Sequence, residues 1–215
     1  AVFAVRGLIP LEIVSTIGGM SLADSWNLAL TDRVAFQHIV ESSHNVIMGF
    51  GGTFLMMVFL CFMTDKDKED NWLGIEKLFQ NGNFYVWTIG TIAATLAYSH
   101  YVLPAAEFKS FATAVGVGAA TYYAIKLLKV LTGSKGNVVQ QGIVGFLYLE
   151  ILDASFSLDG VIAGFAITNN LLVLMLGLGA GAFLVRSMTL HMLDKGTLNM
   201  YEYLDNGAFW SIGAL

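Results

Sequence analysis

The sequence predicts an all-α protein, a polytopic bundle of transmembrane helices with about six to seven spans. Two observations lead to this fold class. Of the 215 residues, 56% are apolar and only 13% are charged, whereas soluble globular domains carry roughly one quarter charged residues. Long apolar runs also recur along the chain, with most of the charges between them. This pattern is typical of a chain that crosses the bilayer several times.

The predicted spans follow one another along the whole chain. Each is predicted to be a helix because backbone polar groups must be paired within lipid, and the runs lack the two-residue alternation of a barrel strand. Pro10 should kink the first span, and the glycines of GLGAGAF at 177–183 should allow close helix contact. The predicted spans are 1–22, 46–63, 86–103, 111–131, 138–168 and 171–193, with a partial one from 208.

The spans are expected to form a single transmembrane domain over residues 1–215. Because the chain opens at Ala1 inside an apolar stretch and a further apolar segment starts at Ala208, we expect additional spans at both ends. Cys61 is the single cysteine, so an intrachain disulfide is excluded.

The distribution of basic residues predicts the orientation of the spans in the membrane. Only Arg33 and Lys109 fall in the connections 23–45, 104–110 and 169–170. Cytoplasmic connections carry an excess of Lys and Arg, so the opposite side, which includes segments 64–85 and 126–137, is predicted to be cytoplasmic. That side holds seven basic residues: Lys66, Lys68, Lys77, Lys126, Lys129, Lys135 and Lys195.

A short internal sequence similarity suggests an inverted repeat. FAVR at 3–6 and FLVR at 183–186 place Phe, Val and Arg at the same offsets, and the two segments lie five spans apart, which gives them opposite directions across the membrane. Inverted repeats are common in transporters, with the substrate site near the bilayer midplane. Because Asp153 precedes Arg186 by 33 residues, the matching acid of the first half would lie before Ala1, so we expect a truncated first half.

The segment LEILDASFSLDG at 149–160 carries the candidate site. Glu150, Asp153 and Ser157 are spaced i, i+3 and i+7 and so share one helix face, and their oxygen atoms suit Mn²⁺, Mg²⁺ or Ca²⁺. Asp159 lies about 120° from that face on a straight helix. Its convergence on a metal ion would need an unwound turn, which Gly160 permits.

An alternative role for these acids is structural. Asp153 or Asp159 could neutralise Arg186 or Arg6 between helices. Arg186 could act as a counter-charge that holds empty carboxylates together, or could extend towards the end of its span. Glu12 is an additional candidate for the site or for helix pairing. We assign no histidine to a metal.

Several function classes are excluded or unsupported. The net charge of −5 and the scattered lysines argue against nucleic acid as a partner. The sequence shows no HExxH motif, no serine with a base at fixed spacing and no thiol dyad, so an enzyme is not expected. We also expect no organic cofactor.

Three segments together resemble the TerC superfamily of tellurium-resistance membrane proteins, in particular its uncharacterised domain-of-unknown-function branch. They are FGGTFLMMVFL at 50–60, FLYLEILDASFSLDGVIAGFAIT at 146–168, and the motifs RSMT, GTL and YLDNGAFWSIGAL between 186 and 215. The resemblance implies two related halves, each with an acidic motif, and a role in divalent metal export, notably of manganese, with links to tellurite tolerance and membrane-protein assembly. It assigns Glu150, Asp153 and Asp159 to the second acidic motif and Arg186 to the following span.

Departures from the family pattern are also clear. The first acidic motif, usually Ser-Phe-Asp-Asn, is absent, and Ser-Leu-Asp-Gly at 157–160 stands where Ser-Phe-Asp-Gly is more usual. Together with the acidic segment 149–160, the resemblance implies an exporter of divalent metal ions in the bacterial inner membrane, with Mn²⁺ ahead of Ca²⁺ or Mg²⁺ as substrate. The alternative is a non-transporting scaffold or assembly factor in a stress-response complex, with a membrane-protein partner or a second copy of the chain.

Overall fold

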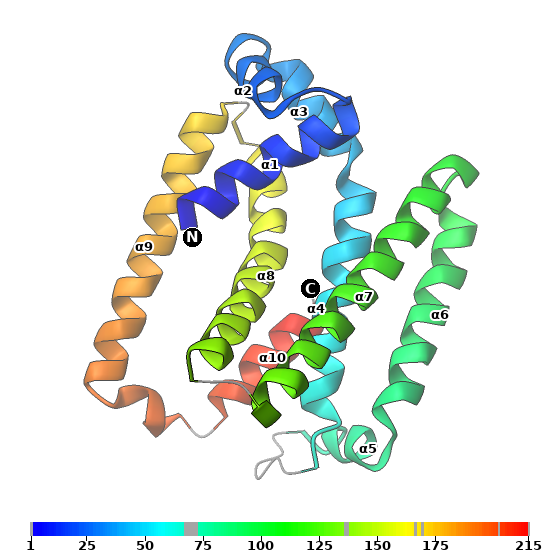
Figure 1. Cartoon of the computed structure of the whole chain (residues 1–215), viewed down its shortest axis with the longest axis vertical. Coiled ribbons are helices and arrows are strands. Elements are labelled where there is room, and N and C mark those ends of the chain that lie inside the picture. The colour runs from blue at the N-terminus through cyan, green and yellow to red at the C-terminus, as the bar shows by residue number, and fades with distance from the viewer. Residues whose placement is uncertain are drawn as a thin grey trace. The chain divides into compact units, whose positions relative to one another are not determined.

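The computed structural model describes residues 2–66, 73–135, 138–165, 167–168, 170–201 and 203–214. These residues form ten α-helices and one 3-10 helix and contain no strand (Figure 1). The all-α prediction is therefore confirmed. The elements are α1 (Val2–Gly18), α2 (Leu22–Thr31), α3 (Arg33–Ser42), α4 (His44–Met63), α5 (Glu76–Asn81), α6 (Phe84–Val102), α7 (Ala105–Lys135), α8 (Val138–Phe165), α9 (Leu171–Asp194), η1 (Thr197–Met200) and α10 (Leu204–Ala214).

Each predicted apolar span corresponds to one helix, with ends that differ by a few residues. Polar side chains and proline set several of these ends. Asn83 precedes α6 and accepts a hydrogen bond from the backbone N–H of Tyr85 at 2.9 Å. Leu103 is extended, with ψ of 144°, as expected for a residue before proline, and this separates α6 from α7.

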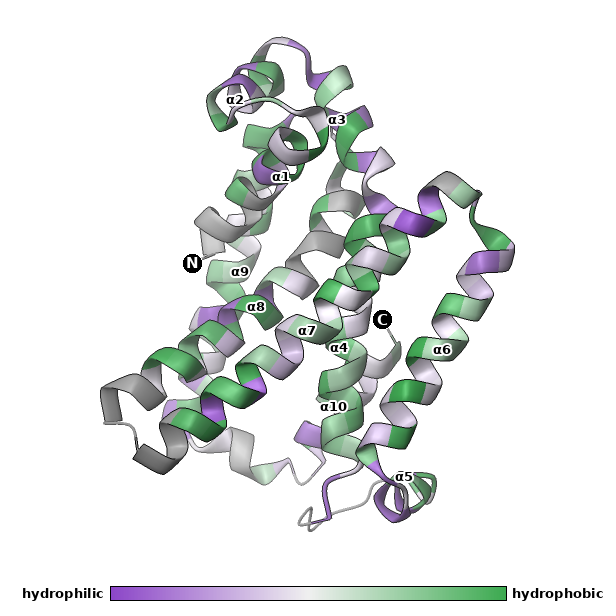
Figure 2. Cartoon of the chain, turned by 45° about the vertical axis from the view of Figure 1, so that its right-hand side comes forward, coloured by the Kyte–Doolittle hydropathy of each residue, from purple (hydrophilic) through white to green (hydrophobic). Residues whose placement is uncertain are grey.

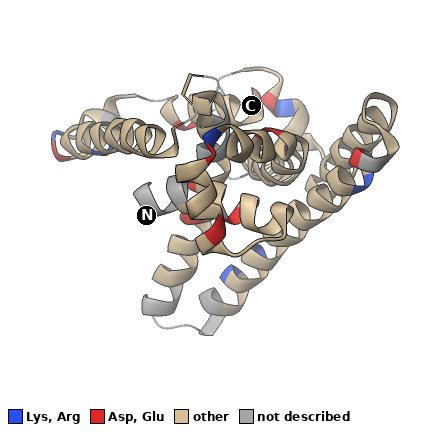
Figure 3. Cartoon of the chain, turned by 90° about the horizontal axis from the view of Figure 1, so that it is seen from above, with Lys and Arg blue, Asp and Glu red and all other residues tan. Residues whose placement is uncertain are grey.

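Three of the described helices are long and apolar enough to cross a membrane: His44–Met63, Glu107–Leu131 and Leu171–Asp194. Figure 2 shows hydrophobic colouring along the long helices, and Figure 3 shows few charged positions among them. These helices indicate a membrane protein. A count of six to seven spans stays a prediction, because α1 and α10, with 17 and 11 residues, are shorter than the roughly 20 residues that a span typically needs.

The connection predicted at 23–45 contains two helices, α2 and α3. Ser21 caps α2 by accepting a hydrogen bond from the backbone N–H of Asp24 at 3.2 Å, and Asp32 caps α3 by accepting from Ala35 at 3.1 Å. Asp32 itself has non-helical backbone angles, which breaks the chain into two helices. From the sequence this polar segment was expected to be a connection, because neither helix has the length or hydropathy of a span.

The chain divides into two compact units, each built from two separate segments. Unit 1 consists of Ala1–Ile47 and Val138–Asp194, and unit 2 consists of Met48–Asn137 and Lys195–Leu215. Unit 1 thus contains α1 to α3 with α8 and α9. Unit 2 contains most of α4, then α5 to α7, and finally η1 and α10.

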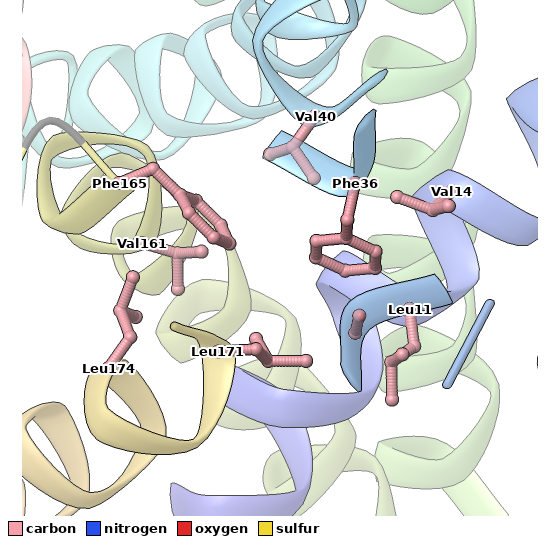
Figure 4. Close-up of a cluster of buried hydrophobic side chains, with 9 residues drawn as sticks. Leu11, Val14, Phe36, Val40, Val161, Phe165, Leu171 and Leu174 are labelled. Carbon is pink, nitrogen blue, oxygen red and sulfur yellow. The ribbon is translucent and has the colours of Figure 1, made fainter. Parts of the chain in front are cut away.

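Unit 1 has a hydrophobic cluster that brings all five of its helices together (Figure 4). Phe36 of α3 lies near Phe165 at the end of α8, with ring centroids 6.0 Å apart. The side-chain amide of Gln37 donates to the backbone oxygen of Phe165 at 3.3 Å, which satisfies a carbonyl group that α8 leaves free at its end. The buried members of the cluster are Leu11, Val14, Ala29, Phe36, Val40, Val161, Phe165, Leu171 and Leu174.

In unit 2, α4 and α7 cross at two glycines. A Cβ atom on Gly118 would lie 2.5 Å from the backbone oxygen of Phe50, and one on Gly49 would lie 3.1 Å from that of Phe111. The helices therefore approach closely enough for backbone to meet backbone, the kind of contact that small residues allow in membranes.

Unit 2 also brings the first turn of α6 next to the second half of α7. The Lys126 ammonium group lies 4.6 Å from the centre of the Phe84 ring and 5.9 Å from that of Tyr85, a cation–π geometry. At the other end of these helices, His100 of α6 lies near Phe108 of α7, with centroids 5.0 Å apart. Phe84 and Lys126, which belong to the two connections predicted to share a side, thus lie at the same end of unit 2. The side of the membrane that this end faces stays a prediction.

Candidate functional site

Two of the three predicted metal ligands have described side chains, and both lie on α8. Glu150 and Asp153 are half-buried and stand one turn apart on the same face of this helix. Ser155, two residues further, is buried and donates a hydrogen bond to the backbone oxygen of Ile151 at 2.9 Å. Ser155 lies roughly opposite Asp153 around the helix axis, and the two acids themselves are neither fully buried nor fully exposed.

The unwound turn that convergence of Asp159 on a shared metal ion would need is not seen in α8. The backbone of α8 is continuously helical from Val138 to Phe165. On a continuous helix Asp159 lies about 120° around the axis from Asp153. The side chains of Asp159 and Ser157 lie outside the described residues.

Arg186 lies on α9, the helix that follows α8. Its side chain is exposed, and together with Phe183, Ser187 and Leu190 it lines an open hollow of about 310 Å³. A guanidinium group in an apolar helix needs an anionic partner or access to water. The hollow provides space beside it for a charged group.

The packing of α8 against α9 places Asp153 and Arg186 at the same level. The two helices run in opposite directions, because a Cβ atom added at Gly160 would lie 3.9 Å from Leu178 and one added at Gly164 would lie 3.0 Å from Leu174. Seven residues back along α8 leads to Asp153 and eight residues forward along α9 leads to Arg186, about 10 to 12 Å in each case. Figure 1 shows α8 and α9 diverging with distance from their connection.

Glu12 and Arg6 both belong to α1. Glu12 is exposed, although Leu11 and Val14 beside it are buried, so its carboxylate lies on the outer face of the helix. The side chain of Arg6 falls outside the described residues. The structure thus does not test the pairing of Arg6 with an acid.

The directions of α1 and α9 agree with the predicted inverted repeat. Leu11 and Val14, from the second half of α1, share the hydrophobic cluster with Leu171 and Leu174, from the first turn of α9. Figure 1 shows α1 running from N towards α2 and α3 and α9 running away from that end, so the two helices run in roughly opposite directions. The two-fold relation itself, and equal depths for the two arginines, stay predictions.

Among the residues with described side chains, no group of three or more His, Cys, Asp or Glu is close enough together to hold a metal ion. Glu150 and Asp153 supply two carboxylates of the predicted set, and the third, on Asp159, is outside the described part. The described geometry is therefore a pair of half-buried acids with an arginine at the same level on the neighbouring helix.

A buried acid in unit 2 was not predicted from the sequence. Glu76 of α5 is fully buried, and its Oε1 accepts a hydrogen bond from the Trp210 indole N–H at 2.7 Å. In the sequence, Glu76 lies in a charged connection that would be expected to be exposed to water. Its partner, Trp210, lies 134 residues away. No local pattern indicates such a contact, so only the tertiary structure reveals it.

Comparison with known proteins identifies a family for the chain. No curated protein and no solved structure matches it. One family model aligns with residues 1–215, from the first residue of the sequence to the last. The chain therefore belongs to the family described as Protein of unknown function (DUF475).

Proposed function

We propose that the protein transports a divalent metal ion, with Mn²⁺ as the first candidate, across the bacterial inner membrane. The observation that carries this proposal is the pair of half-buried acids Glu150 and Asp153, one turn apart on a long helix in a largely apolar segment. Ionised carboxylates in such a setting are costly unless they are paired or bind a cation. Carboxylate oxygens are the ligands that hard divalent ions prefer.

Arg186 has a defined role in this proposal. It stands at the level of Asp153 on α9 and is exposed to an open hollow. In the absence of metal, the positive charge of Arg186 would offset the negative charges of the two acids across the space between α8 and α9. An incoming divalent cation would take over this role. The charge balance of the region is then similar before and after binding, which lowers the cost of releasing the ion. The resemblance to the TerC superfamily implies Asp159 as a third ligand, although on the continuous α8 it lies about 120° around the axis from Asp153.

The test is the substitution Asp153→Asn. Asn keeps the size and one acceptor oxygen of Asp but removes the charge that offsets the lost hydration shell of the ion. The purified protein, reconstituted into vesicles, should then lose Mn²⁺ uptake while its melting temperature in detergent stays near that of the wild type. Asp194→Asn is the matched control, because Asp194 is an exposed acid at the end of α9. It should retain uptake.

The second candidate is a non-transporting scaffold for membrane-protein assembly. Two observations favour it: the continuous α8, which leaves Asp159 off the face of Asp153, and the lack of a metal-ligating group among the described side chains. If the acids only balance Arg186, Asp153→Asn removes part of its counter-charge in an apolar region and lowers the melting temperature of the protein. A lower melting temperature with unchanged Mn²⁺ uptake would therefore reject the transport proposal and support this one.

A further inference from the structure

Helix α2 carries an exposed apolar stripe, formed by Leu22, Trp26 and Leu30. These side chains are 51%, 38% and 41% exposed. They are four residues apart, so each is rotated by about 40° from the last and the three occupy one narrow sector of the helix. A large aromatic ring and two leucines in one exposed sector form an apolar surface that is more stable when it is shielded from water.

The rest of α2 is divided between protein and water. Ser25 and Ala29 are buried and lie beside the apolar stripe, facing the hydrophobic cluster of unit 1. Asp24, Asn27 and Thr31 are exposed and lie on the other side. Around its axis, α2 therefore presents a face against the protein, an apolar stripe and a polar face, in that order.

Helix α3 provides an internal comparison. It packs on the same cluster through Phe36 and Val40, yet its exposed positions are polar apart from Val34. The apolar stripe is thus a property of α2 and is not shared by its neighbour on the same end of unit 1.

The position of α2 indicates what covers the stripe. Ala29 shares the cluster with Leu171 and Leu174, the first turn of α9, and α9 is one of the helices able to cross a membrane. Helix α2 therefore lies at the end of unit 1 where this span begins (Figure 1). In a membrane protein that is the level of the lipid headgroups, where Trp side chains are enriched.

We propose that α2 is an interfacial helix whose apolar stripe lies in the boundary between the headgroups and acyl chains of the bilayer. Helices with an apolar face and a polar face bind in this way by burying apolar area in lipid. The sequence LADSWNLALT contains no Lys or Arg, so the contact rests on apolar burial and not on attraction to anionic lipids. It requires only that the protein is inserted in a membrane and does not depend on metal transport.

The experiment uses nitroxide labels on single cysteines in the full chain, with Cys61→Ser as background. Leu30→Cys and Trp26→Cys report on the apolar stripe. Thr31→Cys and Asn27→Cys, the residues directly following them, report on the polar face as matched controls. The labelled proteins are reconstituted into phosphatidylcholine vesicles, and the collision rates of each label with oxygen and with a water-soluble nickel chelate are measured.

Labels on the apolar stripe should collide severalfold more with oxygen than with the nickel chelate, relative to the labels on the polar face. The difference should persist when half of the lipid is phosphatidylglycerol, because α2 carries no basic residue. Equal access of the chelate to both faces would overturn the proposal. So would protection of the stripe labels from both reagents, since this would mean that protein, either a partner or a second copy, covers the stripe. With a pair of positions on each face, one variant that fails to fold still leaves the comparison.

Discussion

Gly118 is the described glycine at which an added Cβ atom would come nearest to another helix's backbone. A Cβ atom there would lie 2.5 Å from the backbone oxygen of Phe50 and 3.3 Å from the Thr53 Cβ. A backbone oxygen within a helix cannot move aside as the end of a flexible side chain can. The α4–α7 crossing must therefore open if the glycine is replaced.

We predict that Gly118→Ala destabilises the protein by about 1–3 kcal/mol, the usual cost of overpacking. Gly116→Ala is the matched control on the same helix, since a Cβ at Gly116 would meet nothing within 4 Å. Alanine is also the better helix former, so this control should be neutral or stabilise by up to about 1 kcal/mol. Detergent melting curves of the two variants decide the matter, and equal melting temperatures would contradict the close crossing.

The acids of α8 show what single residues in the sequence could and could not predict. The spacing of Glu150 and Asp153 correctly predicted a shared helix face, because that depends only on the helical repeat. It could not predict how near Arg186 lies, because the separation of α8 and α9 depends on packing at Gly160 and Gly164. The unwound turn that Asp159 would need in order to join this face is not seen in the continuous α8.

At the scale of elements, the helix α10 is fixed to unit 2 by aromatic and hydrogen-bond contacts. Phe209 stacks on Phe62 with centroids 3.8 Å apart, and Trp210 meets Phe59 at 5.5 Å. Trp210 also donates to the buried Glu76 at 2.7 Å. This hydrogen bond joins α10 to α5 and gives a buried carboxylate one of its partners.

We predict that Trp210→Phe lowers the stability of the protein by about 1–3 kcal/mol, the cost of taking a hydrogen bond from a buried polar group. The substitution keeps an aromatic ring beside Phe59 and removes the indole N–H. Tyr203→Phe is the control, because Tyr203 is exposed, and it should melt like the wild type. A wild-type melting temperature for Trp210→Phe would show that the hydrogen bond contributes little to holding α10.

The long helices could be predicted from the sequence, whereas the short ones could not. Spans 46–63 and 171–193 differ from α4 and α9 by at most two residues at either end, because hydropathy over some 20 residues is a strong signal. Helices α2, α3 and α5 have ten residues or fewer and lie in polar segments. Short helices depend on capping and tertiary packing, such as the burial of Phe36 and Glu76, which a single sequence does not reveal.

At the scale of the whole molecule, each of the two units has its own internal order. In unit 2, α6 and α7 are consecutive antiparallel helices, and Pro104 lies in the short connection between them. Lys126 meets the first turn of α6, and Lys109 lies 17 residues earlier on α7. That separation corresponds to about 26 Å along a helix, close to the thickness of the hydrocarbon core. The two lysines therefore belong to opposite ends of unit 2.

The seven-to-two distribution of basic residues predicts that the end of unit 2 with Lys77 and Lys129 is cytoplasmic. In intact cells, and in a Cys61→Ser background, Lys77→Cys and Lys129→Cys should resist a membrane-impermeant thiol reagent and react only after permeabilisation. Lys109→Cys should react without permeabilisation, and serves as the control for expression and reagent. Labelling of both Lys77→Cys and Lys129→Cys from outside would reverse the orientation. Labelling of only one of the two would contradict the shared end that the Lys126–Phe84 contact indicates.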